Sequence, residues 1–354
     1  MARTVKHLSL HRIAGTELRV VADVDVGVLP VVQVEEAVIR GYARHSRWPH
    51  HWVNLSILQD LRPLLRQLSR RAELAGTPVG HSLPPGGAVD LDSRPVVNVY
   101  DLADPEGCHV FVNQQAMMKE GYWDDLLAIQ GLLAHEHAHP LAENETVRAS
   151  RQLGVELSPD LDFPISDLGT EDRSSRIVRL LSLLAGKLSV YAPREIFSNE
   201  LTIASGFGDA LLHLNRRNVL NAGRSVAGRP ELGQRLQQEV SGGTLSPTAA
   251  YLLLLIGDLT SYLDLALEIA PFYRAGRESD ARELETVLET ALFPHLEPQV
   301  VQAYTALREQ YVALPADVSP PGLLDWSQGV LRILGQALAE KGLALHWHLW
   351  KRDE

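Results

Sequence analysis

Residues 135–139 of this chain have the pattern His-Glu-x-x-His, and no other feature of the sequence restricts the fold as strongly. An apolar run with helical periodicity precedes the pattern, and two aspartates before that run suit the N-terminus of a helix. Pro140 lacks a backbone N–H and should end the helix. Residues four apart share one helix face, so His135 and His139 can offer two imidazole nitrogens to one metal ion, with Glu136 beside them.

A third imidazole, His137, lies between the two candidate ligands. In a strand, His135, His137 and His139 would share a face, and all three could bind one metal. The apolar spacing before the segment favours the helix, on which His137 points away from the other two. We therefore expect His137 at the surface or behind the ligands.

Composition and charge restrict the class of protein. The 354 residues are 45% hydrophobic and 22% charged, which is enough apolar material for a sizeable core. The net charge of −11 disfavours a nucleic-acid partner, because a phosphate backbone requires clustered Lys and Arg. A single cysteine, Cys108, excludes an intramolecular disulfide and fits a reducing compartment. Since no signal-peptide pattern follows Met1 and the longest apolar run is too short to span a bilayer, we expect a cytoplasmic protein with no membrane partner.

The apolar pattern predicts the remaining elements. Strands are expected at residues 17–28, 96–100 and 108–113, and helices at residues 31–45 and 55–75, the latter followed by a Gly- and Pro-rich loop at 76–87. From residue 171 onward nearly everything is predicted to be helix, with segments at 172–190, 193–220, from 246, 278–292, 297–313 and 323–341, before a closing strand at 343–350.

These elements predict an α+β fold that is predominantly helical. A small β-sheet should pack on the His-Glu-x-x-His helix, and the large C-terminal part should be helical. We expect three regions: N-terminal strand and helices with a loop at 1–95, a core carrying the metal site at 96–222, and a helical region at 223–354.

A catalytic zinc ion takes three protein ligands and keeps one position for water. Two glutamates on the helix predicted from residue 193 are candidates for the third ligand. Glu195 has polar neighbours one turn on, Ser198 and Asn199, and is expected to face solvent. Glu200 has apolar neighbours such as Phe197, so its carboxylate should point into the core, where a metal would be a suitable partner. The sequence therefore predicts Glu200 as the third ligand.

With this third residue the chain resembles the gluzincin metallopeptidases, in which a His-Glu-x-x-His helix is joined by a glutamate from a later helix, often as Asn-Glu. His135, Glu136 and His139 match the first element, and Asn199-Glu200 matches the second. The resemblance implies a zincin-like core and a bound Zn²⁺. It also implies that Glu136 acts as a general base, accepting a proton from zinc-bound water as the water attacks a peptide carbonyl.

The resemblance carries further expectations and two departures. The strand at 108–113 is expected to be the edge that pairs with an extended substrate backbone. From His139 to Glu200 is 200 − 139 = 61 positions, which is longer than in thermolysin-like enzymes and closer to the membrane-associated gluzincins. Thermolysin-like enzymes place an aspartate four residues after the glutamate; that position is Ala204 here, so the partner of His135 behind the metal is not identified.

The leading hypothesis is a zinc metallopeptidase that acts on a peptide or protein substrate, with Tyr191 and His213 as candidate donors to the oxyanion. The alternative is a non-catalytic or regulatory zinc-binding protein on a helical scaffold. Glu136 favours the enzyme, because a structural site does not require a general base. A di-iron helical protein that uses residues 136–139 as Glu-x-x-His is a third hypothesis, but no second such pair lies on a predicted helix.

Overall fold

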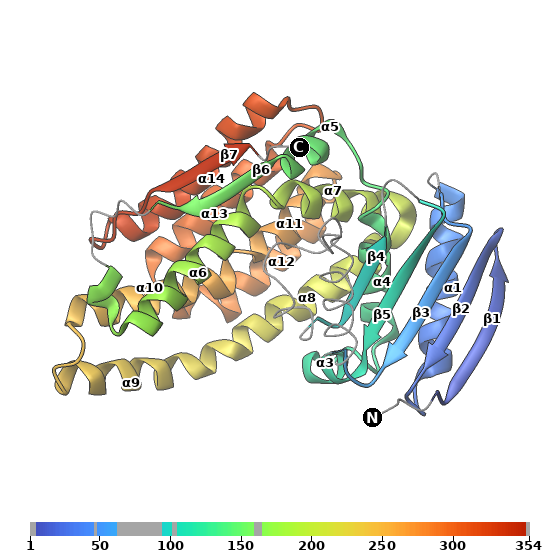
Figure 1. Ribbon diagram of the computed structural model, residues 1–354, viewed down its shortest axis with the longest axis horizontal. Helices are drawn as coiled ribbons and strands as arrows, with labels where there is room; N and C mark the ends of the chain where they lie inside the picture. The colour runs from blue at the N-terminus through green and yellow to red at the C-terminus, as the bar shows by residue number, and fades with distance from the viewer. Residues whose placement is uncertain (1–4, 46–47, 62–93, 101–104, 159–164, 352–354) are drawn as a thin grey trace, which may run out of the picture. The chain divides into compact units, whose positions relative to one another are not determined.

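The computed structural model describes residues 5–45, 48–61, 94–100, 105–158 and 165–351. The described chain is mainly helical with a small mixed sheet, and it divides into two compact units (Figure 1). The first unit comprises residues 1–142 and 198–214, and the second comprises residues 143–197 and 215–354. The three regions expected from the sequence stay a prediction, and their boundaries differ from those of the two units.

The first unit contains a five-stranded sheet in the order β1-β2-β3-β5-β4. Its strands are β1 (His7–Ile13), β2 (Thr16–Ala22), β3 (Trp52–Leu58), β4 (Val96–Tyr100) and β5 (Gly107–Asn113). Strands β2, β3 and β5 run parallel, while β1 and β4 pair antiparallel with their neighbours at the two edges. The two residues between β1 and β2, Ala14 and Gly15, both have positive φ, as a tight hairpin turn requires.

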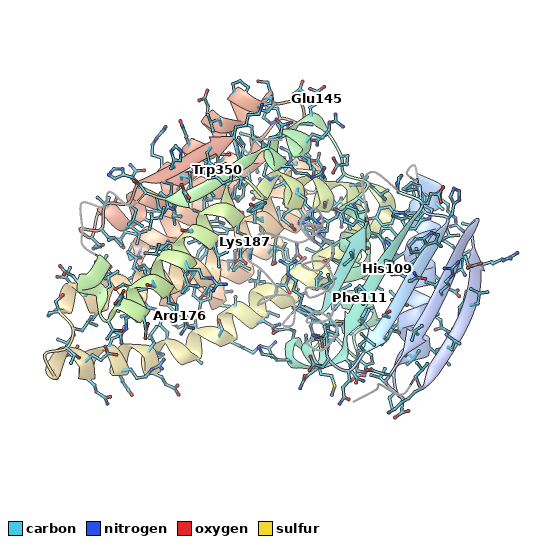
Figure 2. All side chains as sticks on the ribbon, viewed as in Figure 1. His109, Phe111, Glu145, Arg176, Lys187 and Trp350 are labelled. Atoms are coloured by element: carbon cyan, nitrogen blue, oxygen red, sulfur yellow. The ribbon has the colours of Figure 1, made fainter. Side chains whose placement is uncertain are left out.

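Alternation of buried and exposed side chains fixes which face of the sheet is covered. On β5, Val110 and Val112 are fully buried, whereas His109 and Phe111 project from the opposite face and stack with ring centroids 6.3 Å apart (Figure 2). The strands predicted near residues 96–100 and 108–113 are confirmed, and the strand predicted at 17–28 is present but ends at Ala22.

Two expectations about the sheet are wrong. Residues 55–58 belong to β3 instead of a helix, because Val53, Leu55 and Ile57 alternate with polar residues and are fully buried. Residues 59–61 are not helical either. The rest of the helix predicted at 55–75, from residue 62 onward, and the loop at 76–87 lie outside the described residues. Strand β5 is also not an edge, because β4 returns antiparallel beyond it.

Helices α1 (Val28–His45) and α4 (Leu126–Ala138) pack against each other in the first unit, where α1 contacts β1 and β2 and α4 contacts β4. Helix α3 (Gln114–Glu120) connects β5 to α4. The start of α4 is as predicted, since the Asp125 side chain accepts a hydrogen bond from the Ala128 N–H at 3.1 Å. Gly131 in the middle of α4 lies against α8, and a Cβ there would be 2.7 Å from the Ala210 carbonyl oxygen.

The helix predicted at 193–220 is present but is divided. It consists of α7 (Ala192–Thr202), a π-helical turn η3 (Ile203–Phe207) and α8 (Gly208–Ser225). A π-helical turn changes the phase of a helix, and such turns are frequent at functional sites. In the first unit Phe207 of this turn packs against Tyr42 of α1, with ring centroids 5.2 Å apart.

The second unit is built mostly of helices, and the predictions for it are largely confirmed. Its elements are α5 (Glu145–Arg151), β6 (Leu153–Leu157), η2 (Ile165–Leu168), α6 (Glu171–Leu188), η4 (Val226–Gly228), α9 (Arg229–Ser241), α10 (Pro247–Tyr262), α11 (Leu265–Arg274), α12 (Glu278–Ala291), η5 (Phe293–His295), α13 (Pro298–Val312), α14 (Pro320–Ala339) and β7 (Trp347–Lys351). The predicted cap of α10 forms, because the Ser246 side chain accepts from the Ala249 N–H. Strand β7 pairs with β6. The sequence did not indicate β6, α5, α9 and α11 as separate elements.

Within the described parts of the chain, no helix is both long and apolar enough to cross a membrane.

Candidate metal centre

The two histidines of the His-Glu-x-x-His segment lie together at the C-terminal end of α4. His135 is in the last turn, and His139 directly follows the helix with helical backbone angles. Their ring centroids are 4.5 Å apart and their planes are inclined by 78°. His139 is buried and His135 is half-buried. The helical spacing thus produces the pair of imidazoles predicted from the sequence.

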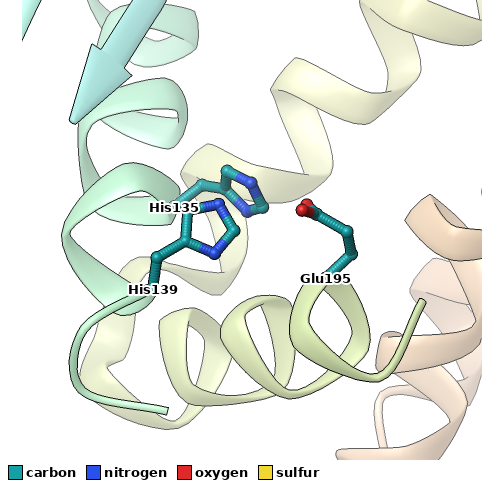
Figure 3. A group of neighbouring side chains, drawn as sticks. All are labelled: His135, His139 and Glu195. Atoms are coloured by element: carbon teal, nitrogen blue, oxygen red, sulfur yellow. The ribbon is translucent and has the colours of Figure 1, made fainter. Parts of the chain in front are cut away.

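Glu195 on α7 completes a group of three potential metal ligands with the two histidines. One ligand atom from each of His135, His139 and Glu195 lies within 4.8 Å of the others, and the Glu195 carboxylate points toward the imidazoles (Figure 3). Two imidazole nitrogens and one carboxylate oxygen are a donor set that suits zinc and several other divalent metals. Glu200, the third ligand expected from the sequence, is not part of this group of described residues.

The reason for this difference lies in the polar stripe of α7. Glu195, Ser198, Asn199 and Thr202 are spaced three and four residues apart and share one helix face. The sequence suggested a face turned to solvent, but Ser198, Asn199 and Thr202 are only 0%, 5% and 0% exposed. This buried face of α7 is polar because it faces the histidines of α4. Glu195 belongs to this stripe, whereas Glu200 leaves the helix in another direction.

Ser198 and Asn199 hold the two imidazole rings from behind. The Nδ1 of His135 lies 2.6 Å from the Asn199 Oδ1, and the Nδ1 of His139 lies 2.9 Å from the Ser198 Oγ. When each Nδ1–H donates to its partner, the unprotonated nitrogen of the ring is Nε2, which is the form of imidazole that binds a metal. Asn199 is therefore the partner of His135 that the sequence left unidentified.

A further contact fixes the end of α4 relative to α1 and α7. The hydroxyl of Tyr42 donates to the carbonyl of Ala134 at 2.7 Å and lies 3.3 Å from the Thr202 hydroxyl. Burial raises the pKa of Tyr42 far above its usual value, so this hydroxyl stays protonated and remains a donor. The residue immediately before His135 is thereby anchored.

Glu136, the predicted general base, contacts the edge strand β4. The backbone N–H of Asn98 donates to the Glu136 Oε2 at 3.3 Å, and the Asn98 side-chain amide donates to the Glu136 carbonyl at 3.1 Å. Glu136 is outside the three-ligand group and adjacent to it in the chain. The Glu136 carboxylate is thus hydrogen-bonded to the edge strand of the sheet.

His137 is not at the surface, which was one of the two positions expected for it. Its ring and the carboxylate of Glu35 on α1 are both fully buried, and the Nε2 of His137 is 2.7 Å from the Glu35 Oε1. Burial alone would lower the pKa of His137, but the neighbouring Glu35 carboxylate, together with Cys108, outweighs burial and raises the pKa to about 10. His137 points away from the metal ligands as the helix requires, and its charge is balanced inside the core.

Of the two candidate oxyanion donors, His213 is engaged elsewhere. Its Nε2 lies 2.8 Å from the Asp125 Oδ2 at the start of α4. Asp125 precedes His135 by ten residues, which is about 15 Å along a helix. The role of Tyr191, which directly precedes α7, stays a prediction.

No protein-family model matches the chain, and searches of curated proteins and of solved structures found no match. The function must therefore be inferred from the chemistry of the site itself.

Proposed function

We propose that the protein is a zinc metallopeptidase in which His135, His139 and Glu195 bind Zn²⁺ and Glu136 acts as the general base. The observation that carries this proposal is the group of three potential ligands, with Glu136, a carboxylate outside the group, directly following His135 in the chain. The donor set fits zinc, because two imidazoles and one carboxylate leave a fourth position for water. A purely structural site would commonly be closed by a fourth protein ligand.

Glu195 as the proposed third ligand supports the resemblance to the gluzincins. With Glu195 in place of Glu200, the distance from His139 becomes 195 − 139 = 56 positions. The residue four positions after Glu195 is Asn199, at the place where thermolysin-like enzymes have an aspartate, and Asn199 is hydrogen-bonded to His135. A zincin-like core within the first unit, supplemented by α7, is therefore part of the proposal.

The chemistry assigned to this chain follows from the positions of its side chains. Bound zinc would lower the pKa of a coordinated water and polarise a substrate carbonyl. Glu136 leaves the helix about 100° from His135, so its carboxylate can accept the proton of that water without entering the coordination shell. Glu136 can then pass the proton to the amine that leaves when the peptide bond breaks.

The edge strand β4 supports a peptide as the substrate. The Asn98 N–H points away from β5, since it donates to Glu136 on the other side. Glu136 takes this outward position at Asn98, so an extended peptide added as a further strand would pair with the other β4 residues that face the same way, Val96 and Tyr100. This assigns to β4 the role that the sequence suggested for β5. A peptide or protein substrate, a cytoplasmic location and the expected lack of nucleic-acid and membrane partners stay predictions.

The proposal is tested by measuring metal content and peptide hydrolysis on the purified chain. We expect about one zinc per chain, together with cleavage in a broad peptide library that a chelator abolishes and added zinc restores. Bound zinc without zinc-dependent cleavage would favour the alternative, a non-catalytic or regulatory zinc-binding protein. Absence of bound zinc would contradict both.

A further inference from the structure

The hydrogen-bond acceptors behind the two histidines are a side-chain amide and a hydroxyl, neither of which carries a charge. The Asn199 Oδ1 is 2.6 Å from His135, and the Ser198 Oγ is 2.9 Å from His139. Both residues are buried, at 5% and 0% exposure, so solvent screens their effect on the rings very little. The chemical nature of these two partners should therefore influence how strongly the imidazoles bind a metal.

A carboxylate in the same place would act differently from an amide. A carboxylate draws the Nδ1–H proton toward itself, which makes Nε2 a better donor to the metal, and it also adds a negative charge near a dication. An amide oxygen orients the ring and fixes its tautomer but adds no charge. Asn199 thus supplies the orientation of His135 without the added basicity.

We propose that Asn199 and Ser198 set the metal affinity of the centre, and that Asn199 keeps this affinity below the value that an aspartate in its place would give. The inference rests on the proposed metal centre of His135, His139 and Glu195. Both residues act through the imidazoles and are positioning residues. As a consequence, the occupancy of the centre follows the free metal concentration over a range in which a carboxylate-supported centre would already be saturated.

The test is zinc affinity, measured by competition with a chromophoric chelator on the full chain, with Zn²⁺ as the added ligand. Outer partners of metal ligands typically change metal affinity by about 10- to 100-fold. We expect Asn199→Asp to lower the dissociation constant about tenfold or more, and Asn199→Ala to raise it by a similar factor. Ser198→Ala should raise it through loss of the acceptor for His139. These opposite signs at one position would not result from a merely structural role.

The matched control is Asn221→Asp, which adds the same charge on α8 at a residue that is not among these partners. Its dissociation constant should equal that of the wild type. The visible spectrum of Co²⁺ bound to each variant reports whether the coordination is retained, and circular dichroism reports whether the fold is. A folded Asn199→Asp variant with unchanged or weaker affinity would overturn the inference, and so would an Asn199→Ala variant with unchanged affinity.

The measurement also separates this inference from the proposed function. No peptide hydrolysis enters the readout, so a protein that binds zinc with affinities insensitive to residue 199 contradicts only the inference. A wild-type chain that binds no Zn²⁺ contradicts the proposed function itself.

Discussion

Glu195 and Asn199 lie four residues apart on α7, so the carboxylate beside the two histidines and the amide bonded to His135 are on one helix face. A helix is stiff over one turn, so the two side chains keep a fixed spacing and face α4 together. This relationship distinguishes Glu195 from Glu200 as the proposed third ligand, and it makes the choice between them testable.

Glu195→Ala should remove most of the bound zinc, whereas Glu200→Ala should leave the zinc content near that of the wild type. The physical reason is that, among the residues that the structure describes, Glu195 is the carboxylate grouped with both imidazoles, and Glu200 is not. Zinc is measured by elemental analysis after dialysis against a weak chelator. Loss of zinc in the Glu200 variant alone would restore the ligand set that the sequence suggested.

Glu136→Gln should keep the zinc and the fold but reduce peptide hydrolysis by about a hundredfold or more, the usual scale of general-base catalysis. Glutamine preserves the shape and can still accept from the Asn98 N–H, while it cannot take up a proton at neutral pH. The comparison is of kcat/KM at equal zinc content. Cleavage that the substitution leaves unchanged would show that Glu136 is not the base.

Glu35→Ala should destabilise the protein by about 3 kcal/mol or more, because it leaves the imidazole of His137 buried without its charged partner. The free energy of unfolding is obtained from urea titration. As a control, Glu35→Leu combined with His137→Leu removes both polar groups and should cost clearly less than the single change. A double variant that is less stable than the single one would argue against an ion pair as the origin of the effect.

His50 should make stability fall on acidification. Burial lowers the pKa of His50 from 6.5 to about 4, although the Pro105 carbonyl at 2.7 Å opposes this shift. Between these two values the unfolded chain takes up a proton that the folded chain does not, so unfolding is favoured as the pH falls. The loss from pH 7 to pH 5 should be about 2 kcal/mol.

The control for this prediction is His50→Gln, which lacks the titrating ring. Urea titrations of both proteins at pH 7 and pH 5 give the loss of stability of each protein. The other titrating groups contribute to both losses, so the difference between the two losses is due to His50. Equal losses of stability in the two proteins would contradict the assignment to His50.

The local features of the site were predictable from the sequence. The start of α4 follows from Asp125, and the pairing of His135 with His139 follows from helical spacing, since both depend on residues close in the chain. The third ligand was not predictable in this way. A polar stripe on α7 looks the same in sequence whether it faces water or two histidines, and only the packing of α7 on α4 separates these cases.

The same limit explains the errors elsewhere in the fold. Glu35, which makes a buried His137 possible, lies 102 positions away in the chain, and nothing local to His137 signals it. Strand β3 was mistaken for a helix because leucines that follow it have helical spacing, while its own alternation covers only a few residues. The position of β4 outside β5 is a matter of sheet topology, which strand patterns alone leave open.

The close approach of α4 and α8 gives Gly131 an influence on the candidate metal centre, which lies one turn further along. Alanine normally favours a helix over glycine by about 1 kcal/mol. At this position its methyl group would meet the Ala210 carbonyl oxygen at 2.7 Å, and neither backbone can yield without moving its helix. Gly131→Ala, which helix propensity alone would favour, therefore displaces the segment that carries His135 relative to α8.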